Sequence, residues 1–262
     1  MSDVLPVADI ALRQIEIYSI IFFRITGIVI LMPFFGSDNV PRLVKIGLSL
    51  VIAIMLVPTL DISDVPLPED LLSYTVLVAR EMIVGMVLGF ISMIIFHGIQ
   101  FAGDLLGFQM GLRIGNIIDP MSDEQISVIG SMQNLLAVLI YIGMSWDHFL
   151  FKAMAASFQV IPVAGVVFEG QLAWELIRMS ADVFIICIKM GAPILAALFL
   201  ADVSLGFIAR TAPQINVFII GFPVKVGLGI FLLGVSMPFF AFVFGKLVHL
   251  MENNIMIALK LL

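Results

Sequence analysis

The stretch YTVLVAREMIVGMVLGFISMIIFHGIQF, residues 74–101, decides the fold class of this chain. Charge interrupts it only at Arg80 and Glu81, and it exceeds the roughly 20 apolar residues that a helix needs to cross a bilayer. Turn-forming residues such as FGSDNVP (35–41) and DISDVPLPED (61–70) separate it from its neighbours. Similar apolar segments are predicted at about 15–35, 43–60, 126–145, 176–200 and 215–244. The sequence therefore predicts an all-α protein with several membrane-spanning helices.

The composition indicates the same class of protein. The chain of 262 residues is 61% hydrophobic and 12% charged, with a mean hydropathy of +1.17. Soluble domains have about 45–50% apolar and about 25% charged residues. The net charge of −6 argues against a nucleic-acid partner, which requires a basic face. The single cysteine, Cys187, lies in an apolar run and allows no disulfide within one chain.

Proline and glycine interrupt the apolar segments and predict kinked helices packed closely together. Gly85 with Gly89, and Gly107 with Gly111, have the small-xxx-small spacing that lets helix backbones approach. This spacing indicates either tight packing within the chain or packing on other subunits. After Gly245, the leucine and isoleucine spacing predicts an amphipathic terminal helix. The prolines concerned are Pro33, Pro58, Pro193, Pro223 and Pro238.

A charge within the first apolar segment, Arg24, requires a partner. A charge at mid-bilayer costs about 2.5–3.5 kcal/mol on insertion scales, whereas a Leu or Ile returns only about 0.3–0.6 kcal/mol. We therefore expect Arg24 to face protein or water and to bind an acidic group. Glu81 is the first candidate and Asp104 the second.

A polar stripe follows one face of the predicted helix over 97–113. Its members are His97, Gln100, Asp104, Gly107 and Gly111, spaced by three or four residues. Such a face either lines a water-filled cavity or admits a second helix closely. The first interpretation includes a proton relay and a small-solute transporter using the stripe around His97 and Asp104. The chain is expected to leave the helix near Gly111 or Gly115.

Motifs for catalysis or for a cofactor are absent from the sequence. It contains no GxSxG, no HExxH and no glycine-rich phosphate loop with its lysine. The histidines, His97, His148 and His249, are too far apart in the sequence for a metal-ligand spacing. We therefore expect no enzyme activity, no cofactor and no metal.

The segment FQMGLRIGNIIDPMSDEQ, residues 108–125, is too polar for a helix that faces lipid and too apolar for an ordinary exposed loop. Non-helical backbone at membrane depth is tolerated only where protein buries it or where it lines a cavity. One interpretation is a semi-rigid loop whose apolar side chains close an internal lumen, as hydrophobic constrictions do in channels. The other is a simple connecting loop.

Four stretches together resemble the FliR family of the flagellar type III export gate. They are RITGIVILMPFFGSDNVPRLVKIGLSL (24–50), REMIVGMVLGF (80–90), FAGDLLGFQMGLRIGNIIDP (101–120) and APILAALFLADVSLGFIARTAPQINVFIIGFPVKVGLG (192–229). The resemblance implies membrane-associated helical hairpins in a single domain, 1–262. That domain is similar to a FliP-like part (about 1–190) fused to a FliQ-like part (191–262).

The resemblance also implies partners and a location. FliR-like proteins join FliP-like and FliQ-like subunits as a single copy, together with FlhB-like and FlhA-like proteins. Unfolded flagellar proteins pass through the resulting channel. The location implied is the bacterial inner (cell) membrane, within the flagellar basal body. Injectisome relatives share the pattern, and the motifs favour flagellar use.

Two sets of site residues complete the expectations. The resemblance places a plug inside the closed channel at Phe108, Gln109, Met110, Gly111, Leu112, Arg113, Ile114, Asn116, Ile117, Ile118 and Asp119. Polar residues expected to be buried or to serve assembly are Arg24, Glu81, Asp104, Arg210, Gln214, Asn216 and Lys225. Arg113 and the acidic stretch 121–125 depart from the family pattern.

Overall fold

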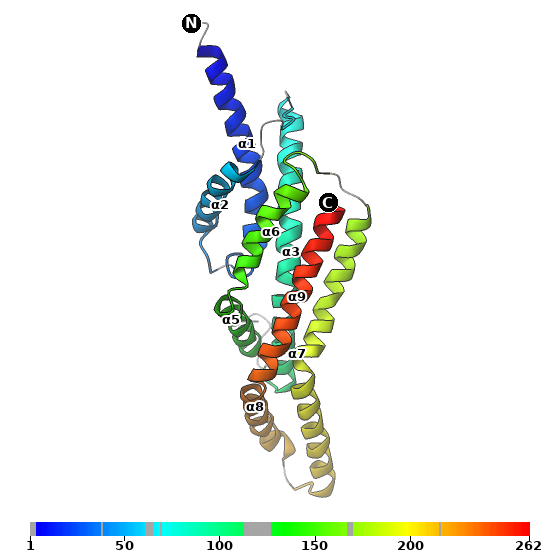
Figure 1. Ribbon diagram of the computed structural model, residues 1–262. Coiled ribbons are helices and arrows are strands. Elements are labelled where there is room, and N and C mark those ends of the chain that lie inside the picture. Colours follow the sequence, from blue (N-terminus) through cyan, green and yellow to red (C-terminus); the bar gives the residue numbers. More distant parts are fainter. Residues whose placement is uncertain are drawn as a thin grey trace. The chain divides into compact units, whose positions relative to one another are not determined.

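The computed structural model describes residues 4–37, 39–60, 65–68, 70–112, 127–166, 170–214 and 216–262, with side chains from residue 13 onward except at 147 and 218. Within these ranges the chain is helical and contains no strand (Figure 1). The predicted all-α class is confirmed. The helices are α1 (Val4–Leu31), α2 (Arg42–Leu56), η1 (Val57–Thr59), α3 (Leu71–Gln109), α5 (Val128–Gly143), α6 (Asp147–Val160), α7 (Gly170–Thr211), α8 (Val217–Val235) and α9 (Met237–Leu261).

Five helical segments of the described chain are long and apolar enough to cross a membrane. They are Arg13–Leu31, Arg42–Thr59, Leu71–Gln109, Gly170–Thr211 and Met237–Leu261. The segments Val128–Gly143 and His148–Val160 add a sixth span if this bent pair, at 73°, is counted as one. The prediction of several apolar helices is therefore confirmed.

Two boundaries differ from the sequence prediction. The segment expected at 215–244 is divided at Ser236 into α8 and α9, and the terminal helix begins at Met237 rather than after Gly245. Pro238 lies in the first turn of α9, where the missing backbone N–H of a proline removes no hydrogen bond within the helix, and it therefore favours a helix start here. Pro193 and Pro223, in contrast, lie inside α7 and α8. The other difference is α6, which occupies a region where only a break near 157–165 was expected.

The chain forms two compact units. The first unit consists of residues 1–93, 145–179 and 251–262, and the second of 94–144 and 180–250. In the first unit, α2 folds back against α1 (Figure 1). In the second unit, the end of α3 packs with α5, α7 and α8.

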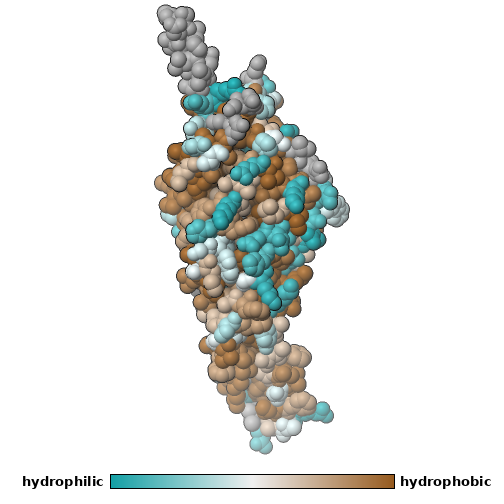
Figure 2. All heavy atoms as spheres, in the orientation of Figure 1, coloured by the Kyte–Doolittle hydropathy of each residue, from teal (hydrophilic) through white to brown (hydrophobic). Residues whose placement is uncertain are grey.

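Large apolar side chains are exposed along the α7–α8 hairpin of the second unit. Figure 2 shows this hairpin, at the lower end of the view, with a mostly hydrophobic surface. The exposed members include Phe184, Phe199, Phe207, Phe222 and Phe231. A continuous apolar surface of this kind is typical of a protein covered by lipid or by partner subunits.

Candidate functional site

Arg24 of α1 is completely buried and is bound on several sides within the first unit. Its Nε donates to Glu81 Oε2 of α3. Its Nη1 donates to the carbonyl oxygens of Ser157 at 3.1 Å and of Ile161 at 2.9 Å. The guanidinium carbon lies 4.3 Å from the centre of the Phe158 ring, a cation–π distance. The predicted contact between Arg24 and Glu81 is confirmed.

Glu81 extends this cluster to the turn that follows α6. Its Oε1 accepts the backbone N–H of Ala164 at 2.9 Å, and Ala164 has a φ of 67°, in the left-handed region. An L-residue other than glycine, asparagine or aspartate is uncommon in that region, so the hydrogen bond helps to hold an unfavourable backbone conformation. Arg24 and Glu81 therefore connect α1, α3 and the chain after α6.

Glycines beside the ion pair bring α1 and α3 into backbone contact. A Cβ on Gly27 would lie 2.9 Å from the Met86 nitrogen, and one on Gly85 would lie 3.0 Å from the Ile28 nitrogen. A Cβ on Gly89 would meet the Leu31 side chain at 2.8 Å. The spacing of Gly85 and Gly89 thus serves packing within this chain.

The second cluster begins where α3 ends. Gly111 has a φ of 85°, and its N–H donates to the Phe108 carbonyl at 2.9 Å. The N–H of Leu112 reaches back to the Gly107 carbonyl at 3.0 Å. These two bonds form a Schellman motif, whose C′ residue is usually glycine because the left-handed conformation carries a steric penalty for other residues. The predicted exit from the helix near Gly111 is confirmed.

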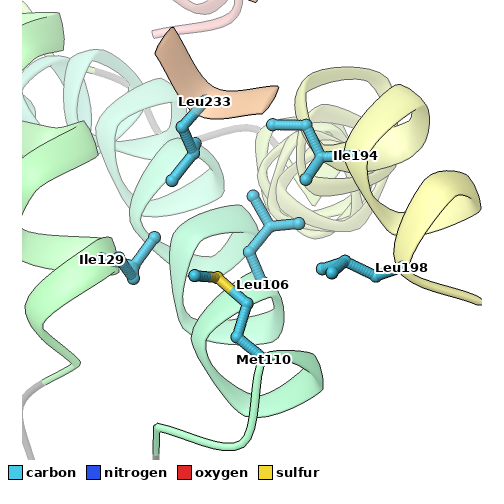
Figure 3. Packing of buried hydrophobic residues seen from close by; sticks show 6 residues of the cluster. All are labelled: Leu106, Met110, Ile129, Ile194, Leu198 and Leu233. Atoms are coloured by element: carbon cyan, nitrogen blue, oxygen red, sulfur yellow. The ribbon is translucent and has the colours of Figure 1, made fainter. Parts of the chain in front are cut away.

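Met110, the last residue before this turn, is fully buried in the second unit. Figure 3 shows its side chain pointing toward residues from α5, α7 and α8. On α8, the contact is made at Gly229, where a Cβ would approach the Met110 Sδ to 2.6 Å. Gly229 leaves the space that the Met110 side chain fills. The cluster consists of Leu106, Met110, Ile129, Ile194, Leu198 and Leu233.

Asp202 of α7 binds two side chains at the same place. Its Oδ2 accepts from Gln109 Nε2 at 2.8 Å, and its Oδ1 lies 2.8 Å from Lys225 Nζ of α8. A cavity of about 330 Å³ adjoins this arrangement and is lined by Met110, Gly111, Asp202 and Lys225 together with apolar residues of α7 and α8. The end of α3 is thus attached to both helices of the hairpin by polar and apolar contacts.

The small and polar face of α3 admits a second helix. A Cβ on Gly103 would lie 2.6 Å from Gly130 Cα of α5, and one on Gly107 would lie 2.9 Å from Ser127 Oγ. Asp104 is half-buried and lies against Gly130 in this contact, whereas His97 is exposed. The part of the stripe at Asp104 and Gly107 therefore forms a helix–helix contact with α5, and the small-solute transporter interpretation has no support from this geometry.

The predicted site residues fall into three groups. The contacts described above contain Arg24, Glu81, Asp104, Gln109, Met110 and Lys225, and the turn that ends α3 contains Phe108, Gly111 and Leu112. The residues Arg210, Gln214 and Asn216, near the turn between α7 and α8, are exposed. Their burial by partner subunits stays a prediction. The plug residues Arg113, Ile114, Asn116, Ile117, Ile118 and Asp119 lie outside the described residues.

Comparison with known proteins places the chain in a family. Residues 15–251 match the family model described as bacterial export proteins, family 1.

This chain belongs to that family.

Curated relatives in the family are flagellar proteins. The chain is 34% identical to the flagellar biosynthetic protein FliR of Bacillus subtilis over 223 residues, covering 84% of this chain and 85% of the relative. It is 26% identical to FliR of Escherichia coli, covering 88% and 87%, and 23% identical to FliR of Aquifex aeolicus, covering 83% of each chain. The resemblance to the FliR family is confirmed, and with it a role in flagellum biogenesis and protein export. Its long apolar helices make this FliR-family chain a multi-pass inner-membrane protein.

The stretches that carry the FliR-family resemblance contact one another in pairs. Arg24 and Gly27 of the first stretch meet Glu81 and the glycines of the second within one unit. Gln109 and Met110 of the third stretch meet Asp202 and Gly229 of the fourth within the other. The sequence did not predict that Asp202 binds the end of α3, because its partner Gln109 is 93 residues away. The available signal was an acidic side chain inside an apolar segment.

Proposed function

We propose that this FliR-family protein is a subunit of the flagellar type III export gate, and that it forms the export channel with FliP-like and FliQ-like subunits. Unfolded flagellar proteins pass through this channel, and residues 108–119 help to plug it when it is closed. The chain itself performs no catalysis, so the energy for transport comes from other components. Membership of the export protein family carries this proposal.

The surface of the chain supports a hetero-oligomeric assembly. The apolar side chains exposed on α7 and α8 accompany polar residues such as Arg210 and Gln214 near one end of the hairpin. Lipid covers apolar residues well but not polar ones, and partner subunits cover both. We propose FliP-like and FliQ-like neighbours here, with this chain as a single copy and with FlhB-like and FlhA-like proteins joining the assembly.

The plug role is supported by the geometry at the end of α3. Met110 is anchored in the core, whereas Phe108 and Leu112 on either side of it are exposed apolar residues. Exposed apolar side chains at the end of a rigid helix suit a barrier that excludes water from a narrow pore. The resemblance further suggests an architecture similar to a FliP-like part, about 1–190, fused to a FliQ-like part, 191–262.

The plug proposal is tested by replacing Met110–Gly111–Leu112 with a shorter polar linker in cells that produce all the gate subunits. The expected result is leakage of small ions through the closed gate, because the apolar side chains no longer exclude water. The matched control applies the same replacement to the exposed residues Gly143–Met144–Ser145 at the end of α5, which should leave the gate tight. Unchanged ion permeability in a fully assembled gate would contradict the plug role.

A further inference from the structure

The contacts at the end of α3 are stronger than the chain needs for a helix stop. The Schellman bonds at Gly111 already satisfy the carbonyl groups of Gly107 and Phe108 in the last turn of α3. In addition, Gln109 donates to Asp202 at 2.8 Å, and the same carboxylate binds Lys225 at 2.8 Å. One acidic side chain of α7 therefore joins α3 to α8.

The negative charge of Asp202 strengthens its contacts with both Gln109 and Lys225. Hydrogen bonds to an ionised group are roughly twice as strong as neutral ones, and the carboxylate, which is 38% exposed, is also held by Lys225, which is 19% exposed. Met110 adds a packing contact beside the polar one, because Gly229 leaves room for its side chain. Two independent contacts, one polar and one apolar, thus hold the same end of α3 against α7 and α8.

We propose that Asp202 is a positioning residue for the closed gate. It anchors Gln109, and through Lys225 the α7–α8 hairpin, so that the residues after Gly111 begin from one defined place. The inference rests on the proposed plug role of 108–119. It adds that the barrier depends on a contact outside the plug, on the α7–α8 hairpin.

The first test changes Gln109, which leaves the Asp202–Lys225 ion pair intact. Gln109→Leu removes one hydrogen bond to a partly exposed carboxylate, and this lowers the ratio of anchored to released chain by about 3- to 10-fold. Because leakage is proportional to the released fraction while that fraction is small, ion leakage should rise by the same factor. Gln109→Glu, which places a second carboxylate beside Asp202, should leak at least as much. Asp182→Ala, on the same helix, is the matched control and should stay tight.

A reversible cross-link provides the second test. A Cβ on Gly229 would lie 2.8 Å from Met110 Cγ. The Cβ of residue 110 is one carbon–carbon bond, about 1.5 Å, from that Cγ. The two Cβ atoms are therefore at most about 4.3 Å apart, which is within the range of a disulfide. In the variant Gln109→Leu/Met110→Cys/Gly229→Cys, oxidation should restore the barrier and a reducing agent should remove it. Substituting Met110 by cysteine also makes room for the new Cβ at position 229.

The outcomes separate the anchor from the plug. Leakage of Gln109→Leu with full assembly, reversed by oxidation of the cysteine pair, is the expected result. A tight Gln109→Leu gate, in cells where the shortened 110–112 linker leaks, would overturn the anchor and leave the plug standing. If the shortened linker is also tight, the plug fails and the anchor fails with it. Assembly is measured in every case by co-purification of the gate subunits.

Discussion

Substitution of Arg24 tests how the first unit is held together. Arg24→Ala removes the partner of Glu81 and the donor to the Ser157 and Ile161 carbonyls. Breaking a buried ion pair by removing one member typically costs about 3–5 kcal/mol, because an uncompensated charge is left behind. The lost cation–π contact with Phe158 contributes to this cost, being worth about 2 kcal/mol or more when desolvated.

The expected result is a loss of assembled complex rather than a change in conductance. A cost of about 3–5 kcal/mol lowers the folded-to-unfolded ratio by two to nearly four orders of magnitude. Because the total stability of a domain is only about 5–15 kcal/mol, less complex should be recovered when the gate subunits are co-purified. Any complex that does assemble should conduct normally. Arg178→Ala is the matched control, since its ion pair with Glu175 is 62% exposed on the arginine side, and exposed pairs contribute only about 0–1 kcal/mol.

A double substitution separates the buried charge from lost packing. In Arg24→Met/Glu81→Leu neither charge is buried, so the complex should be recovered better than with Arg24→Ala alone. Recovery should remain incomplete, because the Ala164 N–H loses its acceptor. The reasoning is wrong if Arg24→Ala assembles fully and only its conductance changes, or if the double substitution is worse than the sum of the single ones.

Two further predictions concern packing and the start of α3. Gly85→Val should abolish assembly, because its Cβ would meet the backbone of α1 near Ile28; Gly47→Ala, with open space around it, should be neutral in the same co-purification, and equal yields would refute the contact. Asp70 accepts the N–H of Ser73 at 2.8 Å, and this bond lowers the pKa of its carboxyl below the ordinary 3.8. A lowered pKa stabilises the first turn fully above pH 3.8, and the effect is lost as the pH falls through the lowered value. Asp70→Ala should therefore speed amide exchange at the start of α3 at neutral pH, and identical exchange in both proteins would contradict the cap.

The ion pair of the first unit could be predicted from the sequence, because a charged side chain in apolar surroundings is costly and few acidic residues were available to bind Arg24. Arg24 needed an acidic partner from another apolar segment, and Glu81 supplied one. The end of α3 was predictable for a similar reason, since Gly111 follows a long apolar run and glycine accepts a left-handed backbone. Both predictions depend on local chemistry with only one or two candidate residues.

The other contacts join residues that are distant in the sequence, and the sequence alone does not show which of several possible partners each residue meets. The stripe containing Asp104 suited a water-filled cavity as well as a close helix contact, and only the position of Gly130 shows that a helix occupies it. The helix α6 was not predicted because Lys152 and Gln159 interrupt its apolar residues, so that the segment is not apolar enough to be recognised as a membrane span. Asp202 had several possible partners, and Gln109 is distant in sequence.

The contacts of Arg24 can form only after its partners, which come later in the sequence, have been synthesised. Glu81 follows Arg24 by 57 residues and Ile161 follows it by 137. At a synthesis rate of about 5–20 residues per second, Glu81 is synthesised roughly 3–11 s after Arg24, and Ile161 roughly 7–27 s after it. During that interval its charge depends on water, lipid headgroups or the insertion machinery. The amino-terminal half of the protein therefore matures only after the ribosome has passed the end of α6.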